Sequence, residues 1–95
     1  MARDVLIVDD EEDIRTLVAG VLHDEGYTTR GAGDADATLE QMALRRPGLV
    51  ILDIWLQGSR LDGLEVLQAI KRDHPSVPVV MISGHGTIET AVKAI

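Results

Sequence analysis

Apolar and polar positions divide the chain into short alternating segments. Three runs of four consecutive apolar residues lie at 5–8, 49–52 and 79–82. Because these runs are uninterrupted and rich in aliphatic side chains, they predict strands that are buried on both faces of a sheet. A more polar segment at 27–32 predicts a weaker strand, of the kind found at the edge of a sheet.

Helical patterns separate the predicted strands. The first predicted helix ends at Gly26, and its apolar positions recur with helical spacing at Ile14, Leu17, Val18, Val21 and Leu22. The second, capped by Asp34 or Asp36, carries Leu39, Met42, Ala43 and Leu44. The third carries Leu64, Val66, Leu67 and Ile70. Residues 87–95 predict the beginning of a fourth helix.

This alternation of strands and helices predicts the fold class. Strands that alternate with helices indicate βαβ units, which build a parallel sheet through right-handed crossovers. The sequence has no internal repeat, no low-complexity tract and no internal linker, and 95 residues suffice for one small domain. We therefore expect a single α/β domain over residues 1–95.

Composition and charge exclude several functions. Nine Lys and Arg against sixteen Asp and Glu give a net charge of −7 without a basic patch, which argues against direct binding of nucleic acid. The absence of cysteine excludes disulfides, thiolate metal sites and cysteine nucleophiles. The first apolar run is too short for a signal peptide or a membrane span, so we expect no membrane association and a cytoplasmic protein.

Polar residues follow each of the three apolar runs. Asp9 and Asp10 follow the first, Asp53 the second and Ser83 the third. Because the carboxyl ends of parallel strands lie along one edge of a sheet, we expect these residues to converge. Neighbouring carboxylates repel one another, and a hard divalent cation such as Mg²⁺ relieves that repulsion. A carboxylate can also act as a nucleophile and form an acyl phosphate. The alternative is that each acid only caps a helix or a loop.

The chain resembles a known family. The stretches V-L-I-V-D-D-E, L-V-I-L-D-I-W, D-G-L-E and M-I-S-G-H look like the receiver domain of two-component response regulators, a CheY-like domain. They are most similar to the NtrC/NtrX type of nitrogen regulation. The resemblance extends over the whole chain and implies a flavodoxin-like, doubly wound parallel sheet of order 2-1-3-4, with the family's fifth strand and helix missing.

The resemblance also implies site residues and partners. It implies that Asp53 accepts a phosphoryl group from the phosphohistidine of a sensor histidine kinase. Mg²⁺ would be held by Asp10 and Asp53, by Asp9 through water, and by the backbone carbonyl of Trp55. Ser83 would be the switch hydroxyl that moves to meet the phosphate. Such a chain is a regulatory phosphoacceptor rather than an enzyme, and its ATPase and DNA-binding output domains would lie beyond residue 95.

The chain departs from the family's pattern, and two other functions stay open. It ends before the fifth strand whose lysine contacts the phosphate, so we expect a C-terminally truncated receiver and assign Lys93 no such role. The loop after Asp53 is longer than usual and lacks proline. A hydrolase with an aspartate nucleophile is one alternative, but such enzymes have a second aspartate where this chain has Trp55. The other is a phosphorylation-independent pseudo-receiver that serves protein interaction.

The missing fifth strand leads us to expect self-association. The predicted strand at 79–82 would lack its outer neighbour, and it carries no charged residue. Unprotected apolar edges recruit other strands through their free N–H and C=O groups. We therefore expect a symmetric homodimer or a soluble aggregate.

Overall fold

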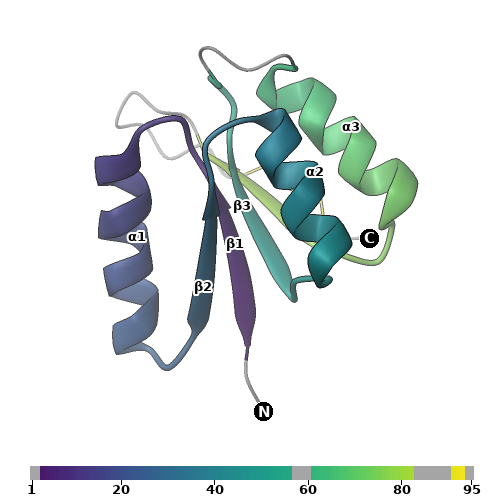
Figure 1. The fold of residues 1–95 in the computed structure, drawn as a ribbon. Helices are drawn as coiled ribbons and strands as arrows, with labels where there is room; N and C mark the ends of the chain where they lie inside the picture. The colour runs from purple at the N-terminus through teal and green to yellow at the C-terminus, as the bar shows by residue number, and fades with distance from the viewer. Residues whose placement is uncertain (1–2, 57–60, 83–90, 94–95) are drawn as a thin grey trace.

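A computed structural model describes residues 3–56, 61–82 and 91–93 (Figure 1). Strands and helices alternate along the chain, as the sequence predicts. The elements are β1 (Asp4–Val8), α1 (Glu12–Asp24), β2 (Thr28–Ala32), α2 (Ala35–Leu44), β3 (Leu49–Asp53), α3 (Gly63–Asp73), β4 (Val79–Ile82) and β5 (Ala91–Lys93). No helix in the described ranges is long and apolar enough to cross a membrane.

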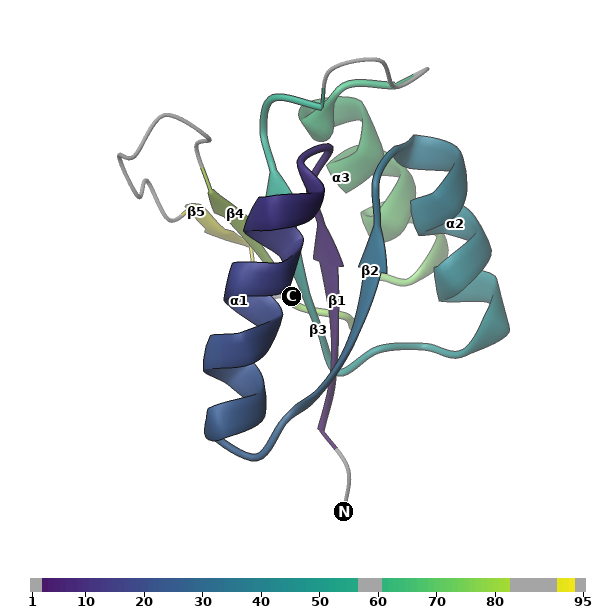
Figure 2. The ribbon, with the colours of Figure 1, turned by 60° about the vertical axis from the view of Figure 1, so that its left-hand side comes forward.

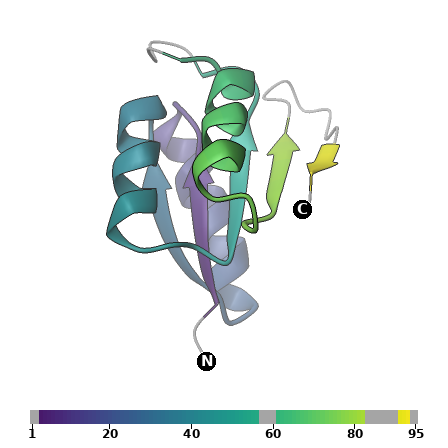
Figure 3. The same ribbon diagram turned by 90° about the vertical axis from the view of Figure 1, so that its right-hand side faces the viewer.

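The sheet has the order β2-β1-β3-β4-β5, and its first four strands are parallel. The predicted order 2-1-3-4 is therefore confirmed, with β2 at the edge. Figure 3 shows α2 and α3 covering one face of the sheet, with α1 behind it on the other. This doubly wound arrangement places the carboxyl ends of the parallel strands along one edge.

The main core lies between the sheet and the two helices α2 and α3. Its fully buried members come from alternate strand positions and from the facing helices, and they include Leu6, Val8, Val50, Leu52, Val66 and Ile70. On the α1 side, β1 is also buried, but Ile51 and Val80 are only half-buried, and α1 contains no fully buried residue. The prediction of burial on both faces therefore holds for β1 and is wrong for β3 and β4, because among the described helices α1 alone covers that face.

Local capping sets the helix ends. Gly26 adopts a left-handed φ of 91° just beyond α1, which confirms it as the stop. Of the two candidate caps for α2, Asp34 is the one used, because its Oδ1 accepts the N–H of Ala37 at 2.8 Å. At the start of α3, Asp62 and Glu65 form a reciprocal capping box, with bonds of 2.9 and 3.1 Å.

The predicted apolar stripes match the buried faces only in part: Met42, Val66 and Ile70 are buried as expected. Leu44 is 72% exposed, and Leu17, Val21 and Leu64 are exposed as well. Of the predicted positions in α2, Met42 is buried, and the rest of the buried face consists of Ala35 and Thr38. Thr38 tolerates full burial because its hydroxyl donates to the Asp34 carbonyl at 2.7 Å. Because Thr38 is polar, the spacing of apolar residues alone does not identify the buried face of α2.

The predicted fourth helix is wrong for the part of 87–95 that the structure describes. Ala91–Lys93 instead forms β5, which pairs antiparallel with β4 in the register Val79↔Lys93 (Figure 2). The outer edge of β4 is therefore paired rather than free. Strand edges recruit extended segments, whereas a nine-residue helix without a packing partner is marginal in water.

Candidate functional site

Three aspartates meet at the carboxyl edge of the sheet. Asp9 and Asp10 follow β1, and Asp53 is the last residue of β3. The two strands are parallel neighbours in the register Val8↔Leu52, which brings the residues that follow them side by side. One carboxylate oxygen from each of the three aspartates lies within 4.8 Å of the other two. The convergence predicted for these three residues is confirmed, whereas Ser83 lies outside the described residues.

Backbone amides orient two of these carboxylates. Asp9 Oδ1 accepts the N–H of Glu11 at 2.9 Å, and Asp53 Oδ1 accepts the N–H of Trp55 at 3.1 Å. Both aspartates are only 3% exposed, and Asp10 is half-buried. Because Oδ1 of Asp53 is held by its own loop, the carboxylate has one defined orientation at the edge of the sheet.

Burial and nearby negative charge raise the pKa values of Asp9 and Asp53. Burial raises the pKa of Asp53; the Trp55 N–H opposes this, and the negative charge of Asp10 adds to it. Burial likewise raises the pKa of Asp9, against the hydrogen bond from Glu11 and together with the charge of Asp53. Holding these carboxylates ionised in the folded protein therefore costs free energy. A bound divalent cation would reduce that cost by neutralising their negative charge.

Trp55, the second residue after Asp53, is largely exposed. It is 56% exposed, while its backbone N–H contacts Asp53. Of the two possibilities for the indole, lining the site or resting on the surface, the structure places it largely on the surface. The main chain of Trp55 contacts the acidic cluster through this N–H.

Two features beside the site were missed by the sequence analysis. Arg15 Nη1 donates to the main-chain carbonyl of Asp9 at 2.6 Å. Gly63, at the start of α3, donates its N–H to the Ile54 carbonyl at 3.2 Å, and a Cβ there would lie 2.5 Å from the Asp53 carbonyl oxygen. The D-G-L-E stretch contained a signal for the second feature, since aspartate followed three residues later by glutamate marks a helix start.

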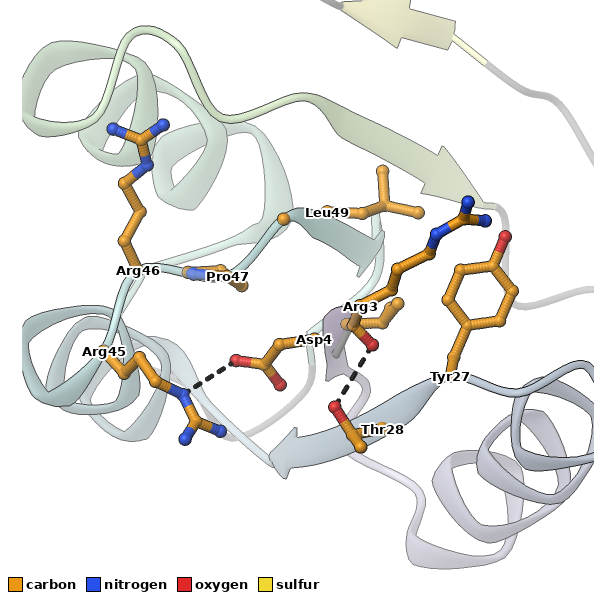
Figure 4. Close-up of a pocket in the computed structure, with 10 residues that line it drawn as sticks. Arg3, Asp4, Tyr27, Thr28, Arg45, Arg46, Pro47 and Leu49 are labelled. Atoms are coloured by element: carbon orange, nitrogen blue, oxygen red, sulfur yellow. Dashed lines mark hydrogen bonds and ion pairs between the residues drawn. The ribbon is translucent and has the colours of Figure 1, made fainter. Parts of the chain in front are cut away.

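A separate hollow lies at the opposite edge of the sheet, among the amino ends of β1 and β3. Its volume is about 660 Å³, and it is lined by arginines around an apolar floor that includes Tyr27, Pro47 and Leu49 (Figure 4). Asp4 faces this hollow and is held by Arg45, at 3.3 Å, and by Arg30, at 2.6 Å. Asp4 therefore forms ion pairs with two arginines and does not belong to the carboxylate cluster at the other edge of the sheet.

Comparison with known proteins defines the class. The family description "response regulator receiver domain" matches residues 5–95, and the chain belongs to this family. Within the family it is a receiver domain of the NtrX/NtrC type. The predicted family, type and fold class are confirmed.

Individual relatives support the same assignment. The chain is 72% identical over 95 residues to the nitrogen assimilation regulatory protein NtrX of Azorhizobium caulinodans, covering all of this chain and 21% of that protein. Over 90 residues it is 33% identical to the DNA-binding transcriptional regulator NtrC of Escherichia coli, covering 95% of this chain and 19% of that protein. The crystal structure of the NtrX receiver domain from Brucella abortus superposes with a TM-score of 0.84 at 66% identity, covering 87% of this chain and 69% of that one. The chain thus spans about a fifth of the length of these two curated relatives.

Proposed function

We propose that Asp53 accepts a phosphoryl group from the phosphohistidine of a sensor histidine kinase. The observation that carries this proposal is the buried Asp53 carboxylate, held by the Trp55 N–H beside Asp9 and Asp10. In the reaction, a carboxylate oxygen of Asp53 attacks phosphorus and forms the new P–O bond. The P–N bond breaks, its electron pair returns to the imidazole, and an acyl phosphate results.

The three carboxylates fit a Mg²⁺ ion as a cofactor. Their oxygens are the ligand type that Mg²⁺ prefers, and burial, together with the neighbouring negative charges, raises the pKa values of Asp9 and Asp53. We assign Asp10, Asp53 and the Trp55 carbonyl as direct ligands, with Asp9 acting through water. When bound, the ion would neutralise negative charge on the phosphoryl oxygens.

The response to phosphorylation would use Ser83 as the switch hydroxyl. Because a hydroxyl recruited after the reaction biases a conformational equilibrium without making the bond, Ser83→Ala should leave phosphoryl uptake partly intact and weaken the conformational response. A shift in amide hydrogen exchange on phosphorylation, compared between wild type and Ser83→Ala, measures that response. An equal shift in both proteins would contradict the role.

The proposal extends to the partners of a full-length protein. We propose that residues 1–95 are the receiver portion of a cytoplasmic regulator whose output ATPase and DNA-binding domains respond to the phosphorylation state. A homodimer is also proposed, although β5 occupies the β4 edge on which that expectation was based. Light scattering of the chain at several concentrations tests self-association, and a monomer at all of them would contradict it.

Chemical phosphorylation tests the central proposal. We expect incubation with acetyl phosphate and MgCl₂ to add the mass of one phosphoryl group, and a peptide map to place it on Asp53. Asp53→Asn keeps the shape of the side chain and should remove the added mass, as should chelation of Mg²⁺. An unmodified wild type would favour the pseudo-receiver, and continuous turnover of acetyl phosphate without an acyl phosphate would favour a hydrolase.

A further inference from the structure

Arg15 connects the first turn of α1 to the main chain of the acidic site. Its Nη1 donates to the Asp9 carbonyl at 2.6 Å, a short hydrogen bond in a half-buried position. The N–H of Asp9 donates in turn to the Ala32 carbonyl of β2 at 3.1 Å. The backbone of Asp9 is therefore held from two sides, by its neighbouring strand and by the arginine.

Two glycines make room for this arginine. A Cβ at Gly31 would lie 3.3 Å from Arg15 Cδ, and one at Gly33 would lie 3.2 Å from Arg15 Nη1. Both distances are shorter than ordinary contacts between Cβ atoms and their neighbours. The absence of a Cβ at Gly31 and Gly33 thus leaves room for the Arg15 side chain to reach the carbonyl of Asp9.

The held carbonyl belongs to the peptide group that joins Asp9 to Asp10. Fixing this peptide limits the positions of both carboxylates, because each side chain branches from an α-carbon at one end of it. We propose that Arg15 is a positioning residue for the cation site, acting through the Asp9 main chain rather than as a ligand. This inference rests on the proposed Mg²⁺ site and names a residue that determines its affinity.

Charge alone predicts the opposite effect of removing Arg15. A guanidinium beside the acidic cluster repels a divalent cation, so its removal would strengthen Mg²⁺ binding if Coulomb forces dominated. Loss of positioning instead weakens binding, because the carboxylates must then be ordered when the ion binds. Partners that orient ligand groups are typically worth about ten- to a hundredfold in metal affinity. The sign of the change therefore separates the two mechanisms.

Calorimetric titration of the folded protein with MgCl₂ tests this assignment. We expect Arg15→Met to raise the dissociation constant for Mg²⁺ about tenfold, and Arg15→Lys, which keeps the charge and one donor, to restore part of the affinity. Gly33→Ala should weaken Mg²⁺ binding in the wild-type background, because its Cβ would displace the Arg15 guanidinium. Added to Arg15→Met, it should have little further effect, because that variant already lacks the hydrogen bond to Asp9. Gly20→Ala, with no atom within 4 Å of the added Cβ, is the matched control.

The outcomes distinguish this inference from the proposed function. Unchanged or tighter Mg²⁺ binding by Arg15→Met would overturn the positioning role while leaving the phosphoacceptor proposal intact. A wild type that binds no Mg²⁺ would overturn the proposed site itself. A lower thermal stability of Arg15→Met with an unchanged dissociation constant would show that the hydrogen bond serves folding only. If Arg15→Met does not fold, Gly33→Ala alone decides, and unchanged binding by that variant overturns the positioning role.

Discussion

The α-carbon of Gly63 lies against the main-chain carbonyl of Asp53, so closely that a Cβ at position 63 would fall 2.5 Å from that oxygen. The same Cβ would lie 2.6 Å from the Ile54 carbonyl oxygen. Because both contacts involve backbone atoms, no side-chain rotation can relieve them. The start of α3 therefore packs directly against the main chain of Asp53, the proposed phosphoacceptor, and of Ile54.

Gly63→Ala should consequently destabilise the protein and disturb Asp53. Overpacking of this kind costs about 1–3 kcal/mol, and we expect a loss in this range in urea denaturation together with slower phosphorylation by acetyl phosphate. Gly20→Ala, in the interior of α1 with open space around it, should be neutral or stabilising by up to about 1 kcal/mol. Equal stabilities for Gly63→Ala and wild type would show that the backbone contact is not as tight as described.

The acidic cluster should reduce stability in the absence of metal. The pKa of Asp53 is raised by burial and by the nearby Asp10, so its ionised form is disfavoured in the folded protein. Its ionisation therefore lowers stability as pH rises from the unfolded-state pKa through the higher, folded-state pKa. Asp53→Asn should raise the free energy of unfolding in EDTA at neutral pH by about 1 kcal/mol. MgCl₂ should stabilise wild type more than the variant, and a less stable Asp53→Asn in EDTA would contradict this account.

The opposite pH dependence is expected at Asp4. Burial alone would raise its pKa, but the hydrogen bonds and charges of Arg30 and Arg45 outweigh burial and lower it below the usual value of 3.8. The ionised carboxylate therefore stabilises the folded state above the unfolded-state pKa, and this contribution disappears as pH falls through the lower, folded-state pKa. We expect Asp4→Asn to cost about 2 kcal/mol at pH 7 in urea denaturation, and the difference from wild type to shrink in strong acid.

An exposed ion pair provides the control for Asp4. Arg72 and Asp73 form a pair at 3.1 Å in which both side chains face solvent. Water screens such pairs, so Asp73→Asn should change the stability at pH 7 little. A difference between Asp4→Asn and wild type that stays constant down to strong acid would mean that the Asp4 charge is not the source of the stabilisation.

Binding of Mg²⁺ should be visible in the fluorescence of Trp55, the only tryptophan. Its N–H contacts Asp53 Oδ1, so an ion that moves this carboxylate also changes the surroundings of the indole. We expect a saturable change on titration with MgCl₂, and Asp10→Asn should remove most of it. Asp13→Asn changes the same charge in the first turn of α1, outside the three-carboxylate cluster, and should keep the response. A full response in Asp10→Asn would exclude Asp10 as a ligand.

The sequence by itself determined the α/β alternation and the meeting of three aspartates. The strand runs, Gly26 and the carboxylates after the first two runs are local signals, and the parallel sheet follows from the alternation of strands and helices through general rules of connection. The proximity of Asp9, Asp10 and Asp53 follows from the sequence alone, because the carboxyl ends of parallel strands share one edge of a sheet. Their burial and the orientation of Asp53 by Trp55 required the folded chain.

Tertiary structure alone decided the contacts between residues far apart in sequence. The buried face of α2 passes through Thr38 and leaves Leu44 exposed, because the position of the sheet, and not hydrophobicity, selects the inner face of a short helix. Pairing of β5 with β4 likewise depends on which segment reaches a free edge. The hydrogen bond from Arg15 to the Asp9 carbonyl, which passes close to Gly33, forms only when β2 lies beside β1. Local patterns encode elements and their ends, whereas side-chain positions depend on neighbours that the fold supplies.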